Sequence, residues 1–76
     1  MESIILKILQ EIRPEFDFSK YNNFIEQGLL DSFDIVTLVA TLDEEFGISI
    51  DGLDIVPQNF KSVNSIVELL TKNGVK

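Results

Sequence analysis

Apolar residues recur at helical spacing in three stretches of the chain. The first stretch is Ile4–Ile12, where isoleucine and leucine follow an i, i+1, i+4, i+5, i+8 pattern. Pro14 ends it, because a proline disfavours the helical conformation at the residue before it. The second runs over about Ser32–Phe46 and stops at Gly47, and the third over about Val63–Lys72. No β-hairpin signal separates them. The pattern therefore predicts an all-α protein with three main helices.

The connection between the second and third helices has room for one short helix. It contains Asp51-Gly52 and Pro57, which restrict helical structure to a turn around Leu53–Val56. Its apolar residues are expected to anchor it to the helices. They are Ile50, Leu53, Ile55, Val56 and Phe60.

The connection between the first and second helices is unusually long. It spans the eighteen residues 14–31 and carries large apolar side chains, among them Phe16, Phe18 and Phe24. A free linker would not hold such groups, so we expect an ordered loop packed on the helices, with a helix around Tyr21–Gln27 as an alternative. We predict one domain over residues 1–76, a small helical bundle of three main helices plus one short helix, with a long ordered loop between the first and second helices.

The chain has neither cysteine nor histidine among its 76 residues. This excludes disulfides, thiolate metal sites and a serine or cysteine nucleophile activated by histidine. The net charge of −7 argues against binding to nucleic acid or to anionic membranes. The start of the chain lacks the basic segment of a signal peptide. We expect a cytoplasmic protein, monomeric because of its like-sign charge, without membrane insertion and with basic protein partners.

The acidity is concentrated in the centre of the chain. Between Tyr21 and Phe60 there are eight acidic residues and no lysine or arginine. One interpretation is a solvated face that keeps the protein in solution. The other is a docking surface that steers a basic partner.

The start of the second helix offers a free hydroxyl. Asp31 is a suitable N-cap, and Asp34 then falls at the third helical position, where an acid favours the helix dipole. Ser32 becomes the first helical residue, with its hydroxyl free. A phosphate on that hydroxyl would be stabilised by the dipole and the unpaired amides of the first turn. By itself, Asp-Ser is also an ordinary helix start.

The second helix has two apolar sides. At about 100° per residue, one stripe forms the expected core face: Ile35, Leu38, Val39, Leu42 and Phe46. Phe33, Val36 and Ala40 fall on a different side, with Ser32 between the two sets. Either a loop covers this second strip, or it is an exposed recognition patch with an acidic rim.

These features together resemble the acyl carrier protein family. The resemblance rests on the segment Phe24-Ile25-Glu26-Gln27-Gly28-Leu29-Leu30-Asp31-Ser32-Phe33, on Leu38, Leu42 and Ile50, and on Glu44-Glu45-Phe46-Gly47-Ile48. It implies that Ser32, within the motif of Asp31 and Phe33, carries a 4′-phosphopantetheine arm. A separate phosphopantetheinyl transferase attaches the arm, whose thiol holds an acyl or aminoacyl group as a thioester. The protein itself is then not an enzyme.

The resemblance also implies a partner surface on the second helix. Its residues would be Phe33 with Asp34, Val36, Ala40, Asp43 and Glu44. The partners would be acyl-activating or adenylating ligases and acyl-transfer enzymes with basic docking surfaces. In some relatives the acyl chain retreats between the helices. The candidate lining here is Leu38, Leu42, Ile50, Leu53 and Ile55.

The cargo and one other class of function stay open. Members that serve fatty acid synthesis usually read Asp-Ser-Leu, whereas this chain has Asp-Ser-Phe and also Ile35 and Thr37. Residues 28–33 are similar to stand-alone carriers, such as D-alanyl carriers, that an adenylating ligase loads. An unmodified acidic helical adaptor is the alternative of another class. A calcium module is disfavoured, because Asp51-Gly52-Leu53-Asp54 lacks EF-hand spacing.

Overall fold

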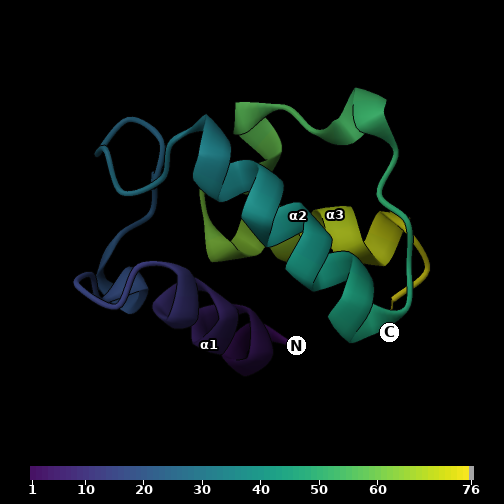
Figure 1. The fold of residues 1–76 in the computed structure, drawn as a ribbon, viewed down its shortest axis with the longest axis horizontal. Helices are drawn as coiled ribbons and strands as arrows, with labels where there is room; N and C mark the ends of the chain where they lie inside the picture. The colour runs from purple at the N-terminus through teal and green to yellow at the C-terminus, as the bar shows by residue number, and fades with distance from the viewer. Residues whose placement is uncertain (76) are drawn as a thin grey trace.

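The protein is built from three α-helices joined by two long connections. The computed structural model describes residues 1–75, and its helices are α1 Glu2–Ile12, α2 Ser32–Phe46 and α3 Val63–Lys72. Helix α1 packs against both α2 and α3, and the long connections lie at the two sides of α2 (Figure 1). No strand occurs in the described part of the chain. The predicted all-α class is confirmed.

The helix ends follow the local sequence signals. Helix α1 stops before Arg13, whose φ of −133° and ψ of 80° are not helical, as expected of a residue before proline. Helix α2 ends at Gly47, which has a φ of +64°, a left-handed conformation that glycine adopts without steric cost. Helix α3 begins after Ser62, whose side chain accepts a hydrogen bond from the Ser65 amide.

One hydrophobic core joins the three helices and both connections. Each α-helix contributes a buried stripe, and that of α2 consists of Ile35, Leu38, Val39 and Leu42. These four belong to the predicted core face, while Phe46, the fifth, is only half-buried. The connections add six buried side chains: Phe18, Phe24, Leu29, Leu30, Ile50 and Phe60.

The α1–α2 connection is ordered by buried aromatic rings. Phe18 and Phe24 are 1% and 0% exposed. Their rings stack edge to face with centroids 5.0 Å apart, a favourable aromatic geometry. A 3-10 turn, η1 Phe18–Lys20, precedes Phe24. The alternative helix around Tyr21–Gln27 does not form: residues 21–23 are irregular or bent, and residues 24–28 form a turn.

The α2–α3 connection contains two short 3-10 turns where we predicted one short helix. They are η2 Gly52–Asp54 and η3 Pro57–Phe60. The expectation that every apolar residue here is an anchor is wrong, since Leu53 is 87% exposed and Val56 is 41% exposed. The next residue, Asp54, has a side chain that is 19% exposed and lies 2.9 Å from Lys72 Nζ through its Oδ1. Because neighbouring residues of a 3-10 turn are about 120° apart, Leu53 lies on another side of the turn, toward solvent.

Candidate functional site

Ser32 is an exposed residue at the start of α2. It is the first residue of the helix, directly after the N-cap residue Asp31. Among the side-chain hydrogen bonds found within residues 1–75, none involves its hydroxyl, because Asp31 caps the helix in its place. The structure therefore shows Asp31 as the helix cap, as predicted, and leaves the Ser32 hydroxyl outside the capping bonds.

A capping box holds the backbone on both sides of Ser32. The Asp34 amide donates to Asp31 Oδ1 at 2.9 Å, and the Asp31 amide donates to Asp34 Oδ2 at 3.2 Å. These two bonds satisfy donors that a helix start otherwise leaves unpaired. The pKa of the Asp31 carboxyl is lowered, chiefly by the hydrogen bond from the Asp34 amide and further by the charge of Arg13.

Arg13, which follows the last residue of α1, reaches this capping box. Its Nε and Nη2 both lie 2.9 Å from Asp34 Oδ2, and Nη2 lies 3.5 Å from Asp31 Oδ2. The hydrogen bond to Asp34 raises the pKa of the Arg13 guanidinium above its already high usual value. Sequence reasoning missed Arg13, since it lies 21 residues from Asp34 and no local pattern connects the two.

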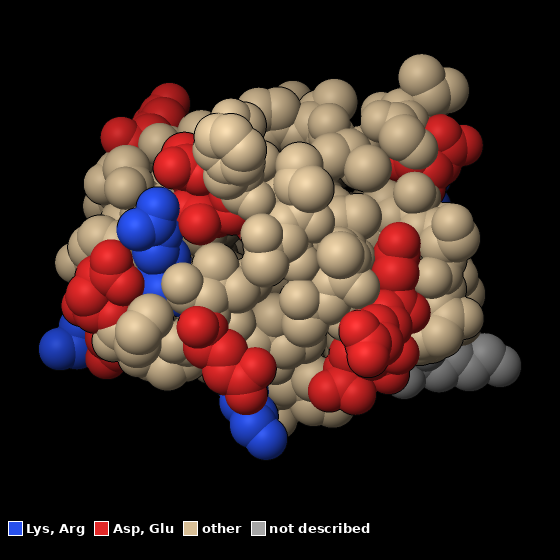
Figure 2. Space-filling view, in the orientation of Figure 1, with Lys and Arg blue, Asp and Glu red and all other residues tan. Residues whose placement is uncertain are grey.

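The apolar strip on α2 is exposed. Phe33 and Val36 are 83% and 64% exposed, and Ala40 is also exposed. Figure 2 shows an uncharged band over α2 between groups of acidic side chains. Neither connection covers the strip. An exposed patch of large apolar groups with charged margins is typical of a protein–protein contact surface.

The three acids expected beside this strip have different environments. The Asp34 side chain is only 13% exposed and is engaged by Arg13. Asp43 is half-buried and its Oδ1 accepts a hydrogen bond from the Ile50 amide at 3.0 Å. Glu44 is exposed. Of these three, Glu44 alone is exposed and takes part in none of the side-chain hydrogen bonds or ion pairs found within residues 1–75.

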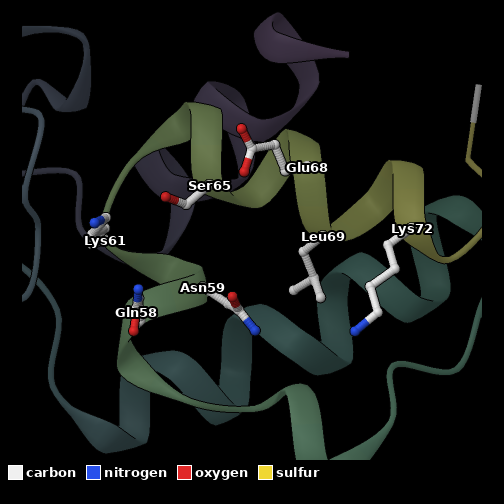
Figure 3. A pocket seen from close by; sticks show the side chains of 7 residues that line it. All are labelled: Gln58, Asn59, Lys61, Ser65, Glu68, Leu69 and Lys72. Atoms are coloured by element: carbon white, nitrogen blue, oxygen red, sulfur yellow. The ribbon is translucent and has the colours of Figure 1, made fainter.

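Of the five residues considered for an acyl-chain lining, Leu53 alone neither belongs to the hydrophobic core nor packs against it. Leu38 and Leu42 are fully buried in the core, whereas Leu53 is 87% exposed. A hollow of about 270 Å³ lies instead between η3 and α3 (Figure 3). Leu69 is its one apolar lining residue, beside six polar or charged ones that include Lys61, Glu68 and Lys72. Such a polar lining does not suit a hydrocarbon chain.

No group of three or more acidic residues within the described residues is arranged to hold a metal ion. No histidine occurs anywhere in the sequence, so Ser32 has no ordinary base to activate it. The Ser32 hydroxyl is thus accessible from solvent at the start of α2.

Comparison with known proteins identifies the family. Residues 3–70 match the family described as "Phosphopantetheine attachment site", and the chain belongs to it. The chain is also 34% identical to the D-alanyl carrier protein of Bacillus velezensis over 71 residues, which cover 90% of each protein. No solved structure matches significantly. No helix within residues 1–75 is long and apolar enough to cross a membrane.

Membership of this family defines the class of protein. The chain is a non-catalytic carrier with a covalently attached 4′-phosphopantetheine and is a substrate of a phosphopantetheinyl transferase. Ligases or acyl-transfer enzymes are its further partners. When bound, the arm supplies a thiol that carries an acyl group as a thioester.

Proposed function

We propose that Ser32 is the residue that receives the phosphopantetheine arm. The observation that carries the proposal is its exposed hydroxyl at the first position of α2, left free because Asp31 caps the helix. A phosphodiester fits there, since the Ser32 and Phe33 amides precede the first helical hydrogen bond and the helix dipole favours an anion. In the attachment, Ser32 Oγ bonds to phosphorus, the adenosine bisphosphate part of coenzyme A leaves, and a base of the transferase takes the hydroxyl proton.

Peptide mapping tests this assignment directly. The protein is incubated with coenzyme A and a promiscuous phosphopantetheinyl transferase, then digested with trypsin. Cleavage after Lys20 and Lys61 gives the peptide 21–61, whose two serines are Ser32 and Ser49. Fragment ions should place one arm on Ser32. An arm on Ser49 or in any other peptide contradicts the proposal.

For the cargo, we propose an aminoacyl group that an adenylating ligase activates. The support is the similarity to a D-alanyl carrier protein together with the Asp-Ser-Phe motif at residues 31–33. Incubation of the modified protein with ATP, D-alanine and a D-alanine-activating ligase should add one alanyl group, released by hydroxylamine as expected of a thioester. Loading by a fatty-acyl ligase and not by this one would favour the acyl alternative.

The docking surface that we propose is the exposed strip of α2 with its acidic margin. Phe33, Val36 and Ala40 supply the apolar contact, and Glu44 supplies an exposed charge, with Asp34 and Asp43 adding to the local negative potential. A fitting partner presents an apolar recess with a basic rim. We expect a single monomeric carrier domain that acts in the cytoplasm, where coenzyme A and ATP are available to these partners.

Reversal of the charge at Glu44 tests this surface. Glu44→Lys should slow modification and loading by about three- to tenfold, because like charges oppose encounter with a basic partner. The effect should shrink at high salt, since ions screen exposed charges. Glu11→Lys, an equal charge change at an exposed position of α1, is the matched control. Equal rates for the two variants would mean that Glu44 is not part of the docking surface.

A further inference from the structure

The contact between Arg13 and the capping box converges on a single oxygen atom. Asp34 Oδ2 lies 2.9 Å from Arg13 Nε and 2.9 Å from Arg13 Nη2, and it accepts the Asp31 amide at 3.2 Å. Nη2 is also 3.5 Å from the carboxylate of Asp31. The guanidinium therefore joins both carboxylates of the box to the end of α1.

The contact between Arg13 and Asp34 is partly shielded from water, which favours a fixed arrangement of the two side chains. The Asp34 side chain is 13% exposed and that of Arg13 is 35% exposed. A carboxylate with so little access to water depends on charged and hydrogen-bonding partners. Without Arg13, the Asp31 amide remains as its partner, and turning toward water would break that bond. The capping box would then lose one of its two hydrogen bonds.

We propose that Arg13 is a positioning residue for the modification of Ser32 and acts through Asp34. The inference rests on the proposed assignment of Ser32 as the attachment residue. Ser32 is the residue directly after Asp31, and its backbone is held by the two bonds of the capping box. Arg13 fixes the box and thereby fixes the direction in which the hydroxyl meets the transferase. Asp34, which also adds to the negative potential of the proposed docking surface, links Arg13 to the box.

The chemistry of the contact requires an arginine. Two nitrogens of one planar group approach the same oxygen, and the group also reaches a second carboxylate. A lysine has a single charged nitrogen on a flexible stem, so it cannot reproduce the two contacts to Asp34 together with the approach to Asp31. Arg13→Lys should therefore recover less than half of the rate lost in Arg13→Gln.

Steady-state kinetics of the phosphopantetheinyl transferase, with this protein as substrate, provide the test. Arg13→Gln should lower kcat by roughly three- to tenfold, because misdirection of a reacting group costs rate. The KM should change by less than about twofold, since Val36, Ala40 and Glu44 lie further along α2 and keep their docking contacts. Lys7→Gln, the same charge change at an exposed position of α1, should leave both constants unchanged.

A double-mutant cycle asks whether Arg13 acts through Asp34. Asp34→Asn should lower kcat by itself, and Arg13→Gln should then add little in that background, because coupled residues are not additive. A full additional loss would contradict action through Asp34. Equal kcat for Arg13→Gln and Lys7→Gln would overturn the proposal outright.

Hydrogen exchange gives a readout that does not depend on the transferase. The Asp31 amide, which donates to Asp34 Oδ2 at 3.2 Å, should exchange faster in Arg13→Gln than in Lys7→Gln, while core amides of α2 remain protected. Equal exchange would overturn the proposal even if Asp34→Asn fails to fold. The assignment of Ser32 is tested separately: an arm found elsewhere refutes that assignment, whereas an arm on Ser32 with unchanged Arg13→Gln kinetics refutes only the positioning role.

Discussion

Replacement of Ser32 by alanine is expected to abolish the gain of one phosphopantetheine while leaving the fold intact. The hydroxyl is the only group of this residue that can bond to phosphorus, so no phosphopantetheine should be added to the variant. The fold should tolerate the change for two reasons. Asp31, not Ser32, caps the helix, and alanine is a good helix former. Intact-mass spectrometry after incubation with coenzyme A and transferase measures the gain, and circular dichroism checks the helices.

Ser49→Ala is the matched control for this experiment. Ser49 is also exposed and lies in the same acidic segment, and its replacement should leave the full mass gain. If Ser32→Ala is modified to the same extent as the wild type, the arm is attached to another serine. A folded wild type without any gain would point to a carrier that needs its own dedicated transferase.

Replacement of Phe24 by alanine is expected to lower the free energy of unfolding by about 3–5 kcal/mol, the usual cost of deleting a buried phenylalanine ring. The ring is fully buried and meets Phe18 edge to face. The backbone of Phe24 also links three segments. Its amide donates to the Lys61 carbonyl at 2.6 Å, and its carbonyl accepts the amides of Leu29 and Leu30 at 2.8 and 3.2 Å. A loss of this size is most of the stability that so small a domain commonly has.

Equilibrium denaturation followed by circular dichroism measures this effect, with Phe33→Ala as the matched control. Phe33 is 83% exposed, so the same substitution there should change stability by no more than about 0.5 kcal/mol. Similar unfolding midpoints for the two variants would mean that Phe24 does not hold the connection in place. The result also bears on the site, since Leu29 and Leu30 lead directly into Asp31 and Ser32.

Local signals in the sequence were sufficient for the helices and for the state of Ser32. Pro14 and Gly47 act through the allowed conformations of single residues or their neighbours, and hydrophobic periodicity acts within one helix. The same holds for Asp31 and Asp34, which are three residues apart and can pair across the first turn of a helix. The apolar strip could be separated from the core face on the helical wheel for this reason.

The exposure of particular loop residues was beyond such reasoning. Leu53 and Ile50 are both aliphatic residues of one connection, yet Leu53 is 87% exposed and Ile50 is 6% exposed. The Ile50 amide donates to Asp43 of α2, and the turn that carries Leu53 is linked to α3 through Asp54 and Lys72. These contacts exist only once the helices are packed.

The sequence by itself determined the three helices, the acidic central segment and a free serine hydroxyl at the start of α2, because each depends on residues within a few positions of one another. Only the tertiary structure decided which acidic side chains are exposed and which are bound by other groups of the protein. Asp34 is taken by Arg13 from 21 residues away, whereas Glu44 stays exposed. The physical reason is that an ion pair between residues far apart in the sequence depends on how the intervening chain folds back, which no local pattern of residues specifies.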